Sequence, residues 1–241
     1  MSTYKKIKGT AVQSIDGEPD NPLKGQLWYD TVDAEFKYKE QVVGNAWSTG
    51  NSLNTARRNL AGAGTQTSAL AIGGGGPPYE AVTESWNGSS WTEVSDLNQA
   101  RRLASGCGAD NTSALSIGGD SGTAIIGNTE SWNGTSWTEV NNLNTGRLYL
   151  AAGGTDNTSG LAFGGYTNVP PGSSTGNTEE WNGVSWAETS NLNTARNGIA
   201  GDGTTTAAIG FSGANPPTSV TTATEEWTGA GATITKTFTT S

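Results

Sequence analysis

The sequence contains no histidine, and it has only one cysteine and one methionine among its 241 residues. Without imidazole, Ser-His-Asp and Cys-His catalysis are excluded, and the copper and zinc centres that depend on imidazole lack their usual ligand. A single cysteine, Cys107, also excludes a disulfide within one chain. Burial and hydrogen bonding must therefore stabilise the fold, and a chain of this length can bury a core without covalent cross-links.

Charged residues are scarce as well, at 15% of the chain, and they leave a net charge of −9. An acidic surface repels the phosphates of nucleic acids and of anionic membranes, so the sequence predicts binding to neither. The N-terminal stretch MSTYKKIKGT lacks the apolar segment of a secretory signal, and no apolar run is long enough to span a bilayer. We expect no membrane insertion.

Small and polar residues take the place of charge. The chain has 35 glycines and is rich in Ser, Thr and Asn, which weaken helices and suit tight turns. Similar phrases return along the sequence, with tryptophans at 47, 91, 137 and 186. The period is therefore about 46 residues, which is typical of a repeat architecture. Composition and period together favour an all-β repeat protein.

One period, residues 101–144, shows the expected local structure. It predicts four short strands with the sequences LASGCGA, SALSIGG, TESW and SWTEV. The last two flank Asn133-Gly134, a strong hairpin signal because both residues tolerate the positive φ of a type I′ turn. A four-stranded antiparallel sheet repeated at this spacing is typical of a β-propeller blade. We expect four or five such blades.

Two tryptophans, a glutamate and an arginine return in the repeats. Blades pack face to face, so we expect the tryptophans to fill the space between them. We expect the arginines to bridge neighbouring blades, and the glutamates to pair with the arginines or with turn amides. The second arginines, Arg58 and Arg102, are predicted to be solvated. The structural repeat residues are Trp47, Trp86, Trp91, Trp132, Trp137, Trp181, Trp186, Trp227, Arg57, Arg101, Arg147 and Arg196. The repeated glutamates are Glu84, Glu130, Glu179 and Glu225.

The segments ALAIGG (69–74), SWNGSSW (85–91) and LNQAR (97–101) follow one order: a hydrophobic strand with Gly-Gly, two spaced aromatics, then an arginine. This order resembles the kelch repeat over residues 51–241, with decay in the last copy, where Gly210-Phe211-Ser212-Gly213 replaces the diglycine. The resemblance implies a kelch-like β-propeller. It implies no particular function, because propellers of this type serve unrelated tasks. The copper site of galactose oxidase, a kelch-type enzyme, has no support without histidine.

The stretch KGQLWYDTVDAEFKYKEQVVGNAWSTG, residues 24–50, resembles short β-segments of bacteriophage tail-fibre and other virion proteins. We therefore expect residues 1–50 to form an N-terminal β-segment in front of the propeller at 51–241. Two alternatives stay open for it: a virion anchor, or a divergent fifth blade. As an anchor it would dock through Trp28, Tyr29 and Lys37.

No constellation of residues predicts catalysis or metal binding. Glu179 and Glu180 are adjacent in a strand, so their side chains point to opposite faces and cannot share a proton. The turns at Asp110-Asn111 and Asp156-Asn157 lack the alternating acids of a calcium loop, and Asp and Asn there stabilise tight turns. We expect no catalytic residue, no metal site, no cofactor and no enzymatic activity.

The loops after the diglycines vary in length and sequence between repeats, and loops on a rigid scaffold commonly carry recognition. They span residues 75–82, 120–128, 166–177 and 214–223. Drift of exposed loops explains this variation equally well. The predicted partner-binding residues in them are Tyr79, Tyr166, Pro77, Pro170 and Pro216.

The first functional hypothesis is a non-enzymatic structural protein of a bacteriophage virion, either a tail-fibre or tail-associated component or a capsid decoration. It would be assembled in the host cytoplasm and localise to the virion. Its expected partners are other virion structural proteins, further copies of itself in a homo-oligomer, and a glycan or protein of the host surface. The alternative is a glycan-binding or glycan-active propeller, a lectin or a glycosidase-like protein. A third reading, an intracellular kelch adaptor, is weakened because no other interaction domain accompanies the repeats.

Overall fold

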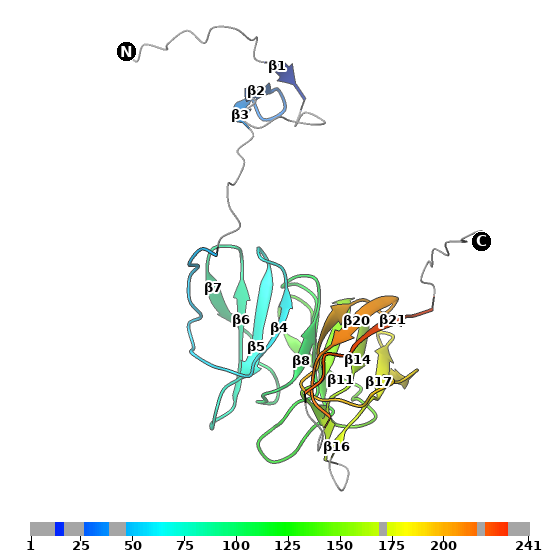
Figure 1. Cartoon of the computed structure of the whole chain (residues 1–241). Coiled ribbons are helices and arrows are strands. Elements are labelled where there is room, and N and C mark those ends of the chain that lie inside the picture. Colours follow the sequence, from blue (N-terminus) through cyan, green and yellow to red (C-terminus); the bar gives the residue numbers. More distant parts are fainter. Residues whose placement is uncertain (1–12, 17–26, 39–46, 169–172, 216–219, 231–241) are drawn as a thin grey trace, which may run out of the picture. The chain divides into compact units, whose positions relative to one another are not determined.

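The computed structural model describes residues 13–16, 27–38, 47–168, 173–215 and 220–230. The chain divides into two compact units, residues 1–49 and 50–241. In the described residues every element is a β-strand, and the strands form small sheets of three or four (Figure 1). The prediction of an all-β chain is confirmed.

The first unit contains one three-stranded sheet. Its strands are β1 (Gln13–Ile15), β2 (Leu27–Asp30) and β3 (Glu35–Tyr38). β2 and β3 form an antiparallel hairpin, whereas β1 pairs with β2 in parallel. This parallel pairing differs from the antiparallel order expected of a divergent fifth blade.

The second unit contains five antiparallel sheets in its described residues. Four of them, the repeat sheets 1 to 4, follow one another along the chain, and the fifth is a small sheet that contains Tyr166. Sheet 1 comprises β4 (Ala61–Gly64), β5 (Ala69–Gly74), β6 (Glu80–Trp86) and β7 (Trp91–Val94). Sheet 2 comprises β8 (Ser105–Cys107), β9 (Ala114–Ile117), β10 (Thr129–Trp132) and β11 (Trp137–Val140). Sheet 3 comprises β13 (Ala151–Asp156), β14 (Ser159–Phe163), β17 (Thr178–Trp181) and β18 (Trp186–Glu188). Sheet 4 comprises β19 (Ala200–Gly203), β20 (Ala207–Phe211) and β21 (Thr224–Thr228).

The outer hairpins of sheets 1 to 3 form where the sequence predicts them. In sheet 1 the loop runs from Asn87 to Ser90, and Asn87 Oδ1 accepts hydrogen bonds from the N–H groups of Ser89 and Ser90, both at 2.9 Å. Only the glycine after the asparagine has a positive φ, at 89° for Gly88. The predicted type I′ turn is therefore wrong. The asparagine side chain closes a longer loop instead, by binding the backbone ahead of it.

The core lies between successive sheets. Trp132 and Trp137 of sheet 2 belong to one buried cluster with Leu70 and Ile72 of sheet 1. Sheet 3 repeats this arrangement on sheet 2, and Trp227 of sheet 4 packs in a third cluster against sheet 3. The paired indoles of one hairpin lie 5.3 Å apart between ring centroids in sheet 2, with the planes tilted. The repeated tryptophans thus provide the apolar contact between neighbouring sheets.

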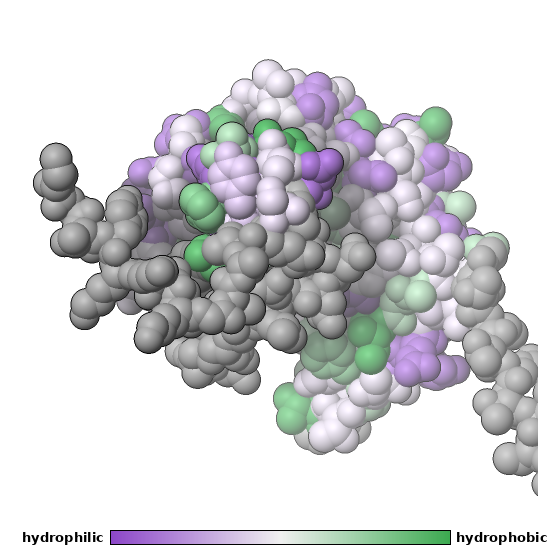
Figure 2. All heavy atoms as spheres, turned by 90° about the horizontal axis from the view of Figure 1, so that it is seen from above, coloured by the Kyte–Doolittle hydropathy of each residue, from purple (hydrophilic) through white to green (hydrophobic). Residues whose placement is uncertain are grey.

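The inner strands β4, β8, β13 and β19 pack in sequence, each against the next. Small residues allow this close approach, because a Cβ added at Gly106 would lie 2.7 Å from the carbonyl oxygen of Gly62. All four strands contribute to the lining of one cavity of about 540 Å³. Seen from above, the described surface is mostly pale and purple with separate green patches, which matches a chain rich in small polar residues (Figure 2).

Candidate functional site

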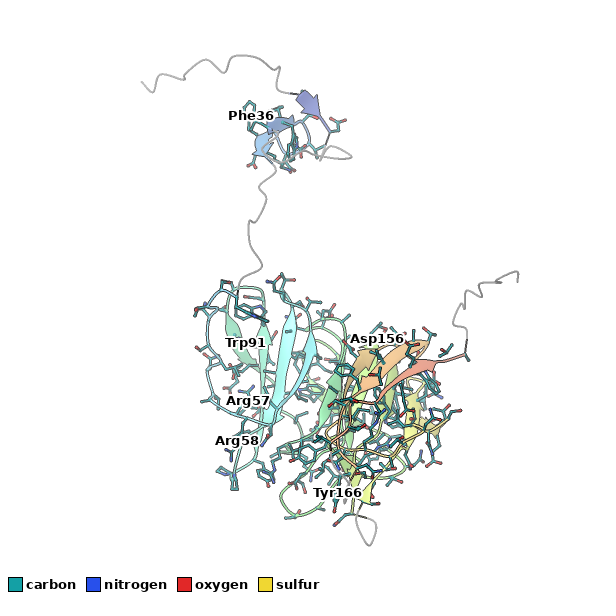
Figure 3. All side chains as sticks on the ribbon, in the orientation of Figure 1. Phe36, Arg57, Arg58, Trp91, Asp156 and Tyr166 are labelled. Carbon is teal, nitrogen blue, oxygen red and sulfur yellow. The ribbon has the colours of Figure 1, made fainter. Side chains whose placement is uncertain are left out.

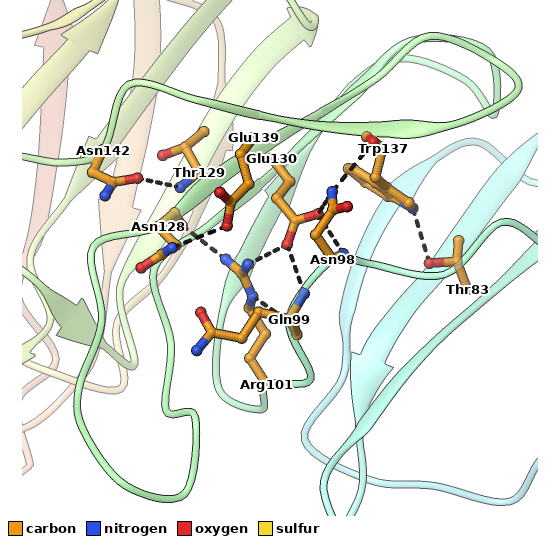
Figure 4. A network of polar contacts seen from close by, with 10 residues as sticks. All are labelled: Thr83, Asn98, Gln99, Arg101, Asn128, Thr129, Glu130, Trp137, Glu139 and Asn142. Atoms are coloured by element: carbon orange, nitrogen blue, oxygen red, sulfur yellow. Dashed lines mark hydrogen bonds and ion pairs between the residues drawn. The ribbon is translucent and has the colours of Figure 1, made fainter.

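A buried ion pair lies at the start of each repeat sheet, and the pair at sheet 2 is shown in Figure 4. The Arg101 guanidinium pairs with Glu130, and both side chains are almost fully buried. Arg101 Nη1 also donates to the carbonyl oxygen of Asn128 at 2.8 Å. The second carboxylate oxygen of Glu130 accepts hydrogen bonds from the N–H and the side-chain amide of Asn98, both at 2.8 Å. The carboxylate is thus saturated with donors.

The same network recurs in every repeat sheet. Each carboxylate accepts hydrogen bonds from its arginine and from the asparagine that lies three residues before that arginine. The pairs are Arg57 with Glu84, Arg101 with Glu130, Arg147 with Glu179 and Arg196 with Glu225. The fourth pair differs in one respect, since the Glu225 side chain is 15% exposed while the other three glutamates are fully buried.

The arginine segment links two sheets. The backbone of Arg101 stays on sheet 1, where its N–H donates to the Glu80 carbonyl and its own carbonyl accepts from Gly74 at 2.8 Å. Its guanidinium reaches Glu130 of sheet 2. Arg147 and Arg196 repeat this arrangement, accepting from Gly119 and Gly165 of the sheet that the chain leaves. Each of these three residues therefore bridges neighbouring sheets.

Burial and pairing shift the pKa values of these groups in opposite directions. Burial lowers the pKa of Arg101 and Arg147, while the neighbouring glutamates raise it. Burial raises the pKa of Glu84, but hydrogen bonds from Arg57 and from the amides of Asn54 and Thr55 outweigh it, so the pKa lies below 4.5. Each buried charge is compensated by its partner, and removal of one partner would leave the other charge buried and unpaired.

The repeated network is suited to holding sheets together and offers little to a substrate. Its charges are buried, and each carboxylate is paired and hydrogen-bonded in the same way in every repeat. Within the described ranges, no group of three or more Cys, Asp or Glu side chains could hold a metal ion. The turn aspartates act on their own loops, since Asp110 and Asp156 accept from Thr112 and Thr158 at 2.7 Å.

The first variable loop makes contacts within the chain. Tyr79, a predicted partner-binding residue, donates from its hydroxyl to Asp120 at 3.3 Å. The Arg102 guanidinium lies over the Tyr79 ring, 4.6 Å from its centroid, and forms a salt bridge of 3.1 Å with Asp120. The Arg102 side chain is thus paired between the loops of sheets 1 and 2 and remains 28% exposed, so it is only partly solvated. Arg58 is exposed, as predicted. Pro77 beside this cluster is exposed.

Of the three other predicted loop residues, the structure describes only Tyr166. Tyr166 is half-buried in a small sheet made of β12 (Arg147–Leu148), β15 (Tyr166–Thr167) and β16 (Ser173–Ser174). Pro170 and Pro216 lie outside the described residues. The structure therefore does not bring the predicted partner-binding residues together in one site.

In the first unit the three predicted docking residues have different environments. Trp28 is only 3% exposed, and no described group accepts a hydrogen bond from its Nε1. Tyr29 is half-buried against Phe36 in an edge-to-face contact with 5.1 Å between centroids. Lys37 pairs with Asp30 at 2.7 Å and with Asp33, and both raise its pKa. Phe36 is the prominent exposed aromatic, at 66% (Figure 3).

Trp47 stands apart from the other predicted repeat tryptophans. Its side chain is 104% exposed, whereas Trp132, Trp137, Trp181 and Trp186 are at most 6% exposed. Trp86 and Trp91 of sheet 1 are half-buried. Equal spacing in the sequence therefore does not give Trp47 an equal environment in this structure.

Sequence reasoning missed a repeated backbone feature that precedes the inner strands. Asn59, Leu103, Tyr149 and Gly198 follow the repeat arginines by two residues, and all four have a positive φ between 55° and 59°. The N–H of each later member donates to the carbonyl of the one before it, at 2.9 to 3.1 Å. They line a pocket of about 230 Å³ beside which Tyr149 is 46% exposed. Because three of the four are not glycine, composition gave no signal for this conformation.

The repeat asparagines Asn54, Asn98, Asn144 and Asn193 were also missed as network members, although each follows a repeat leucine and could have been found by that register. No protein-family model matches the chain, and no curated protein matches it significantly in sequence. No helix in the described part of the chain is long and apolar enough to cross a membrane.

Proposed function

We propose that the four repeat sheets are blades of a kelch-like β-propeller, and that the protein is a non-enzymatic structural component of a bacteriophage virion. It belongs to the tail fibre, to another tail-associated part or to the capsid surface. Further copies of the chain and other virion proteins are its partners, and a host surface molecule is the ligand for an exposed loop.

One observation carries the non-enzymatic part of the proposal. Each of the four ion pairs joins an arginine to a glutamate, and an asparagine in the equivalent position donates to that glutamate. The buried charge is therefore distributed evenly over the repeats. An active site needs a group whose environment differs from that of its equivalents, because catalysis depends on a shifted pKa or an exposed nucleophile at one place. A uniform network supports a rigid scaffold instead.

The resemblance of residues 24–50 to β-segments of virion proteins supports the location. The first unit folds as a separate small sheet with a buried tryptophan, which suits a segment that joins a scaffold to a larger assembly. The predicted docking residues then act through the sheet that Trp28 stabilises, with Phe36 at its surface.

Quantitative peptide mass spectrometry on purified particles, scaled to the major capsid protein, tests this proposal. A copy number in the hundreds indicates a capsid decoration, and a few to tens of copies indicate a tail component. Absence of the protein from particles contradicts the virion function.

A second candidate function is glycan binding at the pocket of about 230 Å³ that Asn59, Leu103, Tyr149 and Gly198 line. It is favoured by Tyr149, an aromatic residue that is 46% exposed and lines a pocket to which all four repeats contribute residues. Exposed aromatic rings stack on the apolar faces of sugars, and nearby amides bind hydroxyl groups. A glycan array with the wild type and the Tyr149→Ala variant tests it. Binding that the variant loses supports the candidate, and no binding by the wild type removes it.

A further inference from the structure

A second arginine follows the repeat arginine before each of the first two repeat sheets, Arg58 before sheet 1 and Arg102 before sheet 2. The Arg58 carbonyl accepts a hydrogen bond from the N–H of Gly75 at 2.7 Å. The Arg102 carbonyl accepts one from the N–H of Asp120 at 2.8 Å. Gly75 and Asp120 are therefore equivalent residues in the loops of the two sheets.

The two arginines differ in their partners. Arg102 holds the Asp120 carboxylate, with Nε and Nη2 both 3.1 Å from Oδ2. Glycine at position 75 supplies no such carboxylate to Arg58. The Arg58 side chain is exposed and has no hydrogen bond or ion pair in the described residues, whereas every other lysine and arginine described there forms an ion pair (Figure 3). A free guanidinium thus lies where its equivalent is paired.

Gly76 leaves the carboxylate-binding edge of Arg58 uncovered. A Cβ added at Gly76 would lie 3.3 Å from Arg58 Nη2 and 3.8 Å from its Nε. The same two nitrogens of Arg102 bind Asp120. This edge of a guanidinium matches the two oxygens of a carboxylate, and such bidentate pairs are strong. An external carboxylate can therefore bind Arg58 as Asp120 binds Arg102.

The loop beside Arg58 is fixed at both of its ends. At one end the N–H of Gly75 donates to the Arg58 carbonyl at 2.7 Å. At the other end the Tyr79 ring contacts the Arg102 guanidinium, and its hydroxyl donates to Asp120. A ligand that binds a loop already held in one conformation loses less free energy to ordering it.

The residues of the loop indicate what else a ligand would carry. Pro77 and Pro78 are exposed and have no N–H, so their backbone offers hydrogen-bond acceptors only. No backbone N–H of the described residues donates to the carbonyls of Gly76 and Pro77. Hydroxyl groups can donate to these carbonyls. A ligand with several hydroxyls and one carboxylate therefore fits, whereas a polyanion is repelled by a chain of net charge −9.

We propose that Arg58 and the backbone of residues 75–78 form a binding site for the carboxylate of an acidic sugar, a uronic acid residue at the end of a glycan. The guanidinium binds the carboxylate through Nε and Nη2, and the loop carbonyls accept from the sugar hydroxyls. The inference rests on the proposed function only for the origin of the glycan, the host surface. The binding itself is a property of the purified chain.

An NMR titration of the ¹⁵N-labelled full chain tests the site. The probes are a trisaccharide that ends in one glucuronate residue and the methyl ester of the same trisaccharide, which lacks the negative charge. The acid should shift the signals of the Arg58 Nε–H and of the Gly75 and Gly76 amides, and the ester should not.

Arg58→Ala tests the guanidinium. It should weaken binding of the acid by roughly tenfold or more, because a charge-assisted bidentate pair is lost. Its thermal midpoint should stay within about 2 °C of the wild type, since the side chain is exposed and has no partner in the described residues. Reduced binding would therefore not result from unfolding.

Gly76→Asp tests the open edge from the other side. The new carboxylate should lie against Arg58 and occupy the site, which should weaken binding by roughly tenfold. The matched control is Thr138→Asp, which adds the same charge to an exposed position of β11 and should leave binding unchanged.

Three results would overturn the proposal: equal shifts with the acid and the ester, unaltered binding in Arg58→Ala, or no shift with either probe. Tighter binding of a peptide with a single glutamate than of the trisaccharide would overturn the assignment of a sugar. Failure here is distinguishable from failure of the virion function, because the first is measured on purified protein and the second on purified particles.

Discussion

The second and fourth repeat sheets have nearly the same sequence pattern but different environments. In β9 of sheet 2, Leu115 and Ile117 are fully buried because the tryptophan pair of sheet 3 covers them. In β20 of sheet 4, the equivalent Ile209 and Phe211 are 40% and 43% exposed. The strands form in both cases. Local sequence is therefore sufficient for the strand, and the neighbouring sheet decides whether its apolar face is buried.

This difference is expected of a repeat protein, whose stability is a sum of terms within repeats and terms between neighbours. The interface between sheets 2 and 3 has two indoles, a hydroxyl partner and a fully buried ion pair. The interface between sheets 3 and 4 has one indole in the described residues, and its glutamate is partly exposed. The first interface should therefore contribute more to the free energy of unfolding.

The largest effect should come from breaking a fully buried ion pair. Arg101→Ala leaves Glu130 charged and buried, which should cost about 3 to 5 kcal/mol in the free energy of unfolding. Arg196→Ala should cost less, because the Glu225 side chain can regain some water. Urea denaturation of both variants measures the difference. An equal or larger loss for Arg196→Ala would contradict the comparison.

Removing one indole should cost more stability at a complete interface between two sheets than at the end of the repeat array. Trp186→Ala should cost about 3 to 4 kcal/mol, since the side chain is 6% exposed and its Nε1 is bound to Thr129. Trp91→Ala, at the half-buried equivalent in sheet 1, should cost about 1 to 2 kcal/mol. Denaturation midpoints give both values when the dependence of the free energy of unfolding on denaturant is the same in both variants. A cost for Trp91→Ala equal to or larger than that for Trp186→Ala would show that sheet 1 is covered at least as fully as sheet 3.

Acid should weaken sheet 1 through Glu84. The folded pKa of Glu84 lies below its ordinary value of 4.5, so the folded protein binds fewer protons than the unfolded chain around that pH. This contribution to stability is complete above pH 4.5 and is lost as the pH falls through the folded pKa. Thermal midpoints between pH 7 and pH 3 should fall in this range, and the fall should be smaller in Glu84→Gln. An equal fall in that variant would assign the acid sensitivity to other groups.

The smallest signal should come from Cys107, which lies in the core between sheets 2 and 3. Burial raises the pKa of its thiol to about 12, with the charges of Asp156 and Asp202 adding to the rise. The native thiol should therefore resist alkylation at pH 8, because the reactive thiolate is nearly absent. Labelling followed by mass spectrometry measures this. Rapid labelling without denaturant would mean that the interface between sheets 2 and 3 opens readily.

Much of the repeat could be predicted because its signals are local. The Asn-Gly pairs located the hairpins, and SALSIGG predicted the strand β9, although all four residues of that strand are buried rather than alternately exposed. The regular spacing of tryptophan, glutamate and arginine anticipated which side chains meet, since equal register in equal sheets gives equal contacts. These predictions needed no knowledge of the angle between sheets.

The remaining features depend on contacts between segments without a common register. The cluster of Tyr79, Arg102 and Asp120 joins two loops of different length, so spacing could not place it. The positive φ of Leu103 and Tyr149 arises where chains meet around the inner strands, and neither residue type favours that conformation. The exposure of Ile209 reflects which sheet lies next to it, a property that no repeat contains.

The most direct test of the account is hydrogen exchange, followed by mass spectrometry, on β9 in the wild type and in Trp186→Ala. If the tryptophans of the next sheet bury the apolar face of each sheet, β9 should be protected in the wild type and lose protection in the variant. The equivalent strand β20, whose Ile209 and Phe211 are already 40% and 43% exposed, should be unchanged. Equal exchange of β9 in both proteins would contradict the account, because the burial of sheet 2 would then not depend on sheet 3.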